Sequence, residues 1–223
     1  MISKKKTFFA GITFVIAFII WTFLVLIIDV KSIGPNNSSV GFAWINGYFH
    51  NKIGVNMPLY VITDWLGFVP IIIAFSFAIL GLLEWIKRKS LLKVDYSILI
   101  LGIFYIVVIG IYVLFEMIVI NYRPILIDGY LEASYPSSTT MLTICVMPTA
   151  LIQYKYRIKN KILRRVIIHI IAIFTVFMVI GRLISGVHWI TDIIGGAIVS
   201  TGLVLIYCSI CKLYNSQQKK TDK

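Results

Sequence analysis

The chain has 223 residues, of which 59% are hydrophobic and 13% are charged, and its formal net charge is +12. This composition is too apolar for an ordinary soluble domain. A basic chain first suggests a nucleic-acid partner. Here, however, the Lys and Arg residues cluster in short segments between long apolar blocks, which is typical of membrane topology signals. We therefore expect the membrane bilayer as a partner, and no nucleic acid.

Six apolar segments follow one another along the chain, and each is long enough to predict a transmembrane helix. They are Thr7–Ile28, Trp65–Ile86 (broken by Pro70), Tyr96–Ile120, Thr139–Tyr154, Val166–Ile184 and Ile190–Ile210. The first follows a run of lysines, as in a signal peptide. It is longer than the roughly 7–15 apolar residues of a signal peptide and lacks a small-residue cleavage site, so we interpret it as an uncleaved helix.

The basic residues orient these helices. Segments at the amino end, after the second and fourth spans, and at the carboxyl end hold 17 of the 21 Lys and Arg residues. The other face keeps Lys31, Lys52, Arg123 and Arg182. By the positive-inside rule, the sequence predicts an all-α integral membrane domain over residues 1–211, with six transmembrane helices and both termini cytoplasmic.

Two polar segments lie outside the spans. The outer loop at 29–57 is long enough to cover a site. Within it, Ser38–His50 is predicted to be a short amphipathic helix at the membrane interface, with aromatic anchors such as Trp44 and Tyr48. The segment at 212–223 is polar and basic, and we expect a disordered tail there.

The stretch from Val179 to Gly196 places Arg182, His188 and Asp192 inside otherwise apolar sequence. Ionisable residues at membrane depth are costly, which makes them candidates for function. His188 and Asp192 are four residues apart, a spacing that puts both on one face of a helix. A carboxylate beside an imidazole orients the ring and stabilises its cation, and an arginine fork suits phosphate. The combination predicts phosphoryl transfer.

The predicted topology brings further polar groups to the same depth. An isolated arginine or histidine at a helix end usually extends to the interface for structural reasons. Likewise, Pro136 and Ser137 alone would indicate a capped helix start. Three distant segments nevertheless deliver polar side chains to one outer surface. These polar side chains are those of Arg123, Ser137, Arg182, His188 and Asp192.

Three motifs in this order carry a family resemblance: Arg123–Pro124, then Pro136–Thr139, then Gly181-Arg182-x5-His188-x3-Asp192. They resemble the signature K-x6-R-P, P-S-G-H and S-R-x5-H-x3-D of the type 2 phosphatidic acid phosphatases. This family is the membrane branch of the vanadium haloperoxidase superfamily. The resemblance extends from about Glu116 to Asp192, and it agrees with the six-span layout.

The resemblance implies a mechanism and a set of site residues. His188 would be the nucleophile that forms a phosphohistidine, and Asp192 would orient it. The implied phosphate-binding residues are Arg123, Arg182, Ser137, Ser138 and Thr139. The family implies no metal and no organic cofactor. Its substrate class is a lipid phosphate.

Three functional positions of the family signature are changed. Glu116 stands at the family lysine, Gly181 at the serine, and Thr139 at the histidine that acts as general acid. General acid catalysis is typically worth about 10²–10⁴-fold, and its loss slows monoester hydrolysis most. The absence of this histidine therefore favours a diphosphate lipid, such as a polyprenyl diphosphate, as the substrate. Alternatively, a neighbouring acid takes the place of the histidine. The substitutes on the outer face are His50, Glu132 and Asp128.

We predict a membrane lipid phosphatase that hydrolyses a phosphate or diphosphate headgroup at the outer leaflet. The alternative is a catalytically weakened relative that binds or translocates phospholipid, which Thr139 and Glu116 favour. His188 and Asp192 favour the enzyme, because a phosphate binder needs no nucleophile. The layout fits a multi-pass protein of a bacterial plasma membrane.

Overall fold

The computed structural model describes residues 4–221, with the backbone alone at 4, 156 and 213–221. This part of the chain is helical, and its β-bridges are isolated pairs. The α-helices are α1 Lys4–Ile27, α2 Ala43–Ile53, α3 Met57–Leu66, α4 Phe68–Arg88, α5 Tyr96–Met117, α6 Ser138–Arg157, α7 Lys161–Ile184 and α8 Ile190–Thr221. Two short 3₁₀ helices, η1 Pro35–Asn37 and η2 Leu91–Lys93, lie in connections.

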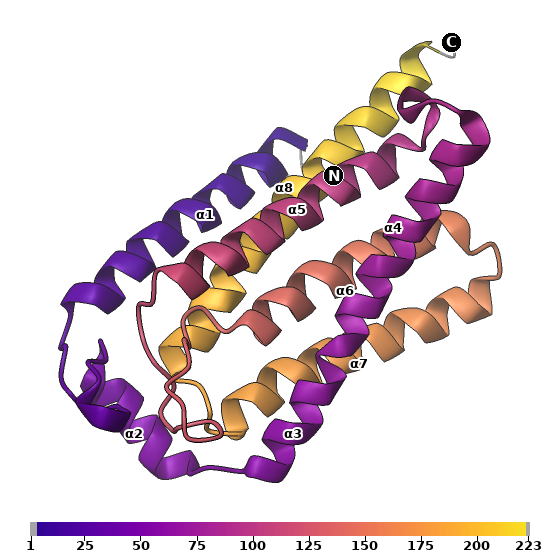
Figure 1. The fold of residues 1–223 in the computed structure, drawn as a ribbon. Helices are drawn as coiled ribbons and strands as arrows, with labels where there is room; N and C mark the ends of the chain where they lie inside the picture. The colour runs from indigo at the N-terminus through magenta and orange to yellow at the C-terminus, as the bar shows by residue number, and fades with distance from the viewer. Residues whose placement is uncertain (1–3, 222–223) are drawn as a thin grey trace.

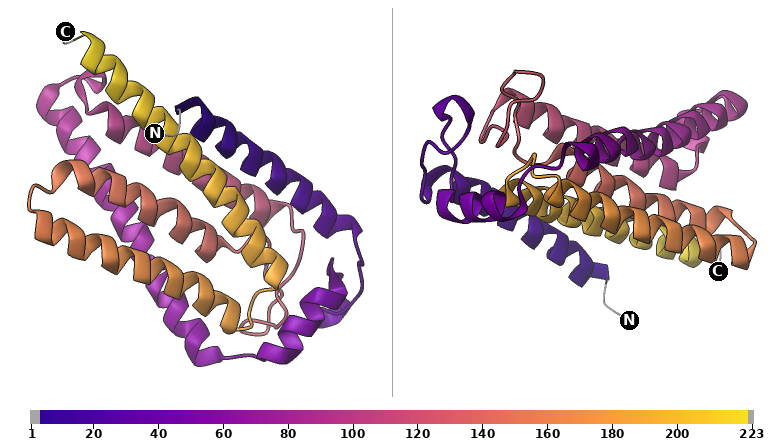
Figure 2. Two further views of the ribbon diagram at one scale, coloured as in Figure 1. Left: turned by 180° about the vertical axis from the view of Figure 1, so that it is seen from behind. Right: turned by 90° about the horizontal axis from the view of Figure 1, so that it is seen from below.

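The long helices form a bundle whose longest connections gather at one end (Figure 1). α8 packs against α1 and α6, and α6 packs against α7. The connections at 28–42 and 118–137, together with α2, lie at the end where α8 begins (Figures 1 and 2). The first turn of α1 and the last turn of α8 lie toward the opposite end. The bundle thus brings the polar connections to the amino-terminal end of α8.

In the part of the chain that the structure describes, five helical segments are long and apolar enough to cross a membrane. They are Lys5–Ile27, Met57–Arg88, Tyr96–Met117, Lys161–Ile184 and Ile190–Lys212. The predicted span at 139–154 forms α6, but it falls short of this apolarity because it carries buried polar side chains. Thr149 Oγ1 lies 3.2 Å from Tyr105 Oη on α5, and Gln153 Nε2 donates to Tyr207 Oη on α8 at 2.7 Å. These groups find partners inside the bundle that lipid does not provide.

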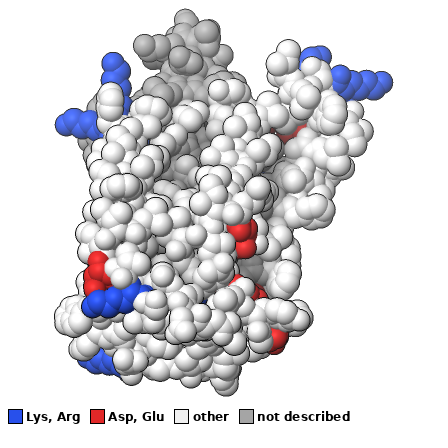
Figure 3. Space-filling view, turned by 60° about the vertical axis from the view of Figure 1, so that its left-hand side comes forward, with Lys and Arg blue, Asp and Glu red and all other residues white. Residues whose placement is uncertain are grey.

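The outer helices present apolar side chains to their surroundings. Ile72 and Phe75 on α4 are each 65% exposed, and Ile106 on α5 and Ile173 on α7 are each 69% exposed. On the face in Figure 3, the Lys and Arg side chains lie toward the two ends, and most of the surface between them is uncharged. Such a surface is stable in contact with lipid, and the fold is that of an integral membrane protein.

The predicted second span, Trp65–Ile86, consists of parts of two helices. α3 ends at Leu66, and the N–H of Gly67 donates to the carbonyl of Thr63 at 3.0 Å. Pro70 lies in the first turn of α4, where a missing N–H costs no helical bond. The interruption is therefore at Gly67 and not at Pro70, and it allows α3 to lie against α7.

The predicted interfacial helix at Ser38–His50 is α2, which begins at Ala43 and ends at Ile53. Trp44 is 72% exposed on one side of it. On the other side Asn46 is fully buried, and its Nδ2 donates to Thr191 Oγ1 at 3.0 Å. This bond ties the outer loop to the first turn of α8.

α8 continues as a helix to Thr221, through most of the segment at 212–223 for which disorder was predicted. Residues 222 and 223 lie outside the described part of the chain. The segment contains no glycine or proline, so nothing in it ends a helix that is already formed.

Candidate active site

His188 lies in the turn between α7 and α8, and Asp192 lies in the first turn of α8. Their exposed fractions are 4% and 0%. The prediction that both occupy one face of a helix was wrong, because α8 begins after His188. The turn itself brings them together, since Asp192 Oδ2 accepts a bond from the Trp189 N–H at 3.0 Å. Gly186 makes this turn at φ +69°, and a Cβ there would lie 1.9 Å from the Gly54 carbonyl oxygen.

Ser134 connects the histidine to the aspartate. His188 Nδ1 and Asp192 Oδ2 are 3.8 Å apart, which is too far for a direct hydrogen bond. The Ser134 hydroxyl lies 3.1 Å from His188 Nδ1 and donates to Asp192 Oδ2. Asn121 Nδ2 donates to the other carboxylate oxygen at 3.3 Å. Asp192 therefore reaches the imidazole mainly through Ser134.

This chain of bonds determines which nitrogen of His188 carries the proton. An ionised carboxylate only accepts hydrogen bonds, so the single proton of Ser134 points to Asp192. The Ser134 oxygen is then an acceptor for Nδ1–H of His188. The lone pair remains on Nε2, which is buried without a partner among the described residues. That nitrogen is the nucleophilic atom of the ring.

Burial lowers the pKa of His188 from 6.5 to about 4. The neighbouring Asp192 carboxylate raises the pKa of His188 and so opposes this shift, whereas the positive charges of Arg123 and Arg182 lower the pKa further. The lowered pKa keeps the imidazole neutral at physiological pH. A neutral ring is the form that can attack an electrophile.

Arg182 is 2% exposed, at the end of α7. Its Nη2 donates to Thr139 Oγ1 and to Asp64 Oδ1, each at 2.8 Å. Its Nη1 donates to Thr63 Oγ1 at 3.3 Å and to the Tyr60 carbonyl oxygen at 3.4 Å, and its Nε is buried without a hydrogen-bond partner in the described chain. The guanidinium is thus held rigidly, with one N–H left to bind a ligand.

Arg123 belongs to the connection between α5 and α6. Its Nε lies 3.1 Å from Glu132 Oε2, and Glu132 is partly exposed. The guanidinium lies 5.7 Å from the ring centre of Tyr60, and that of Arg182 lies 5.0 Å from the same ring. Nη1 of Arg123 is buried and lacks a hydrogen-bond partner among the described groups. Tyr60 therefore brings the two cations together despite their repulsion.

The second motif begins α6. Ser137 precedes the helix and is fully buried, with its hydroxyl donating to Thr140 Oγ1 at 3.1 Å. Ser138 and Thr139 form the first turn of the helix. The positive end of the helix dipole, with its free backbone N–H groups, is therefore adjacent to the Thr139 hydroxyl that accepts a bond from Arg182.

Two arginines, a helix amino terminus and a neutral imidazole thus converge at the end of the bundle. The family model of the PAP2 superfamily matches residues 98–215, which run from α5 into α8. The chain belongs to the PAP2 superfamily. This match confirms the family that the three motifs indicated.

A solved relative shares the fold. The chain is similar to the crystal structure of a transmembrane PAP2 type phosphatidylglycerolphosphate phosphatase from Bacillus subtilis, with a TM-score of 0.54 and 19% sequence identity. The match covers 93% of this chain and 96% of that chain. At this identity the likeness establishes a common fold. No curated protein matched the sequence.

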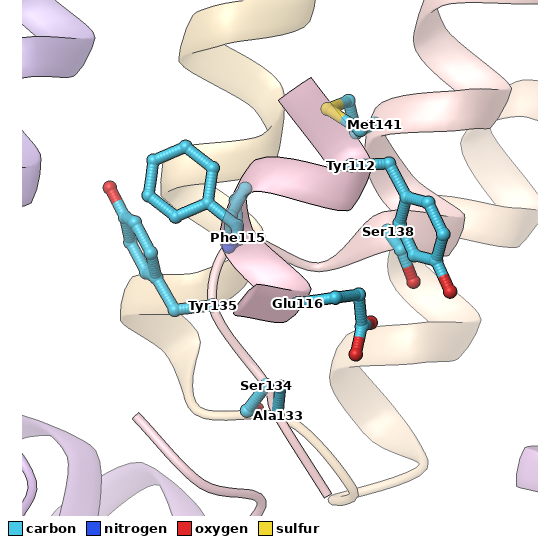
Figure 4. Close-up of a pocket in the computed structure, with 9 residues that line it drawn as sticks. Tyr112, Phe115, Glu116, Ala133, Ser134, Tyr135, Ser138 and Met141 are labelled. Atoms are coloured by element: carbon cyan, nitrogen blue, oxygen red, sulfur yellow. The ribbon is translucent and has the colours of Figure 1, made fainter. Parts of the chain in front are cut away.

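Two departures from the PAP2 signature have structural consequences. A Cβ at Gly181 would lie 2.8 Å from Cγ2 of Thr63, so the serine of the signature does not fit against α3. Glu116, at the lysine position, is exposed at the end of α5. Figure 4 shows its side chain beside a small pocket that Tyr112 and Ser134 also line.

The three predicted substitutes for the missing acid of the PAP2 signature are placed differently. Glu132 pairs with Arg123, within the site. His50 packs its ring 5.5 Å from that of Trp189, and burial lowers its pKa from 6.5. Asp128 is exposed in the turn between Ile127 and Tyr130. Within the described part of the chain, Glu132 is the one of these three that contacts a residue predicted to bind phosphate, namely Arg123.

Sequence reasoning missed five residues of the site: Asn121, Ser134, Tyr60, Thr63 and Asp64. The last three have the spacing i, i+3 and i+4, which places them on one face of α3. This spacing of polar residues, just before an apolar segment, could have identified the three as candidate site residues from the sequence. Ser134 and Asn121 gave no signal beyond their nearness to the motifs. Among the described residues, His, Cys, Asp and Glu form no cluster of three or more that could hold a metal ion.

Proposed function

We propose that this protein is an integral membrane phosphatase that removes phosphate from a lipid at the outer leaflet, through a phosphohistidine on His188. The observation that carries the proposal is the unpartnered Nε2 of a buried, neutral His188 near Arg123 and Arg182. Buried polar groups normally have hydrogen-bond partners. Unpartnered nitrogens on both arginines and on the imidazole are best explained by a ligand with several acceptor oxygens. A phosphate group meets this requirement.

In the proposed reaction, the Nε2 lone pair attacks phosphorus while the bond to the leaving oxygen breaks. Arg123 and Arg182 hold the other phosphoryl oxygens and stabilise their charge. Ser134 and Asp192 hold Nδ1–H and stabilise the positive charge that develops on the ring. Water then attacks the phosphohistidine, which releases phosphate and restores the neutral imidazole.

Three further features belong to the proposal. The positive-inside pattern supports cytoplasmic termini, six membrane crossings and a site that faces outward. The crossings would be the five apolar segments and α6. The family resemblance supports catalysis without a metal. Membership in the superfamily and the likeness to a phosphatidylglycerolphosphate phosphatase support a lipid phosphate as substrate.

The test is phosphate release by the purified protein in detergent with a chelator present, on phosphatidic acid and on a polyprenyl diphosphate. We expect release that His188→Ala abolishes. His169→Ala is the matched control, because this histidine is exposed on α7 and its Nδ1 contacts the Arg165 carbonyl at 2.8 Å. A folded wild-type protein that binds both lipids but releases no phosphate would instead support the binding or translocation alternative.

A further inference from the structure

The steps proposed above do not include a group that donates a proton to the leaving oxygen. In the family signature a histidine provides it, but Thr139 stands at that position, and a threonine hydroxyl does not release a proton at physiological pH. A carboxyl group lies beside this threonine. Arg182 Nη2 donates at 2.8 Å both to Thr139 Oγ1 and to Asp64 Oδ1. Because the two oxygens share one nitrogen, Asp64 occupies the neighbourhood that the missing histidine would occupy.

A groove connects this point to the lipid-facing side of the bundle. It has a volume of about 500 Å³ and runs between α4, α5 and α6. Asp64 and Thr139 line it together with Ile71, Val108 and Leu142 and other mainly apolar side chains. A phosphate on Arg182 with its lipid chain in this groove would present its bridging oxygen close to Asp64.

We propose that Asp64 is the general acid that protonates the leaving group. This inference rests on the proposed phosphatase function. In the first step the P–Nε2 bond to His188 forms and the P–O bond to the lipid breaks. The leaving oxygen takes the electron pair of that bond and the proton of the Asp64 carboxyl group. The products are the lipid alcohol and an Asp64 carboxylate.

In the second step the Asp64 carboxylate accepts a proton from the attacking water. The new P–O bond forms, the P–Nε2 bond breaks, and inorganic phosphate leaves. Asp64 is then protonated again and ready for the next cycle. The proton thus moves from the carboxyl group to the alcohol and is replaced from water, so both steps balance.

The ion pair between Asp64 and Arg182 is compatible with this role. The carboxylate, whose side chain is 51% exposed, acts as the counter-ion of the buried guanidinium until a substrate arrives. A substrate phosphate takes over Arg182 and would repel a carboxylate in its place. Binding a proton removes that repulsion.

The other acids of the site are placed less well for this task. Glu132 pairs with Arg123 and is not among the residues that line the groove. Glu116 is exposed beside a different, smaller pocket with Tyr112 and Ser134 (Figure 4). Among the described carboxyl groups, Asp64 combines contact with a phosphate-binding arginine and access to the groove.

The test compares substrates that differ in how much their leaving group needs a proton. Phosphatidic acid releases an alcohol and needs an acid, whereas p-nitrophenyl phosphate releases a stable phenolate and does not. We expect Asp64→Asn to lower kcat on phosphatidic acid by about 100-fold or more, and kcat on p-nitrophenyl phosphate by less than about fivefold. Its KM should stay the same or fall, because the counter-ion of Arg182 is gone.

Glu132→Gln is the matched control, and it should change the two rates by the same factor. Equal losses on both substrates in Asp64→Asn, or a gain on both, would overturn the proposal. If Asp64→Asn does not fold, the wild-type protein decides the question with a series of alkyl and aryl phosphates. A weak dependence of kcat on the leaving group supports an acid, and a steep dependence overturns it. Absence of wild-type release on every substrate would reject the phosphatase function itself.

Discussion

The Ser134 hydroxyl lies 3.1 Å from Nδ1 of His188 and also donates a hydrogen bond to the buried Asp192 carboxylate. The serine thereby transmits the orienting effect of the aspartate across a gap of 3.8 Å. In the proposed mechanism Ser134 is a positioning residue, because it bonds to Nδ1 of His188 and has no hydrogen bond to Nε2, the nitrogen proposed to attack phosphorus.

Ser134→Ala should lower kcat about 10–100-fold, since a hydrogen bond to a charged group is worth about 1.5–3 kcal/mol. KM should change little, because the arginines that bind phosphate are untouched. Ser134→Thr keeps the hydroxyl and should recover most of the activity. The measurement is kcat and KM on phosphatidic acid for the three proteins. Equal losses in the alanine and threonine variants would show that the hydroxyl has no positioning role.

The acid limb of the pH profile should lie near the lowered pKa of His188. In the proposed mechanism only the neutral imidazole attacks phosphorus, so activity should be lost as pH falls through the pKa of His188 in the free enzyme. Burial lowers that pKa from 6.5 to about 4. We therefore expect kcat/KM, which reports the free enzyme, to hold down to about pH 5. A limb centred near pH 6.5 would mean that water hydrates the ring in the working enzyme.

Gly181→Ser, which restores the serine of the PAP2 signature, should destabilise the protein. A Cβ at this position would lie 2.8 Å from Cγ2 of Thr63. Overpacking of this kind costs about 1–3 kcal/mol. Thr63→Ser removes Cγ2 and keeps the hydroxyl that bonds Arg182, so the double variant should recover much of the loss. Thermal unfolding in detergent measures the effect, and additive losses in the double variant would contradict the steric explanation.

The proposed topology can be tested by labelling of single cysteines. In a background with the three native cysteines replaced, we expect a membrane-impermeant maleimide to label Asp128→Cys in intact cells. Lys159→Cys should react only after permeabilisation. Both side chains are exposed, one between α5 and α6 and the other between α6 and α7. Because α6 separates them, labelling of both from the outside would show that α6 does not cross the membrane.

Much of the fold follows from local properties of the chain. Long apolar blocks form helices because a buried or lipid-facing backbone must satisfy its own hydrogen bonds. The spans at α1, α5, α7 and α8 were therefore predictable to within a few residues at most of their ends. α6 was placed correctly as a helix, but its interior position depends on partners for Thr149 and Gln153 that lie on other elements. The break at Gly67 likewise reflects how α3 packs on α7.

The site divides in the same way. The sequence by itself determined which residues are the candidates for the chemistry, since an arginine, a histidine and an aspartate at fixed spacing in apolar sequence have few structural explanations. The tertiary structure decided how they act. Ser134 and Asp64 are ordinary polar residues in sequence, and they become significant through contact with His188 and Arg182. Such contacts depend on distances between elements far apart along the chain, which no local pattern of hydropathy or charge encodes.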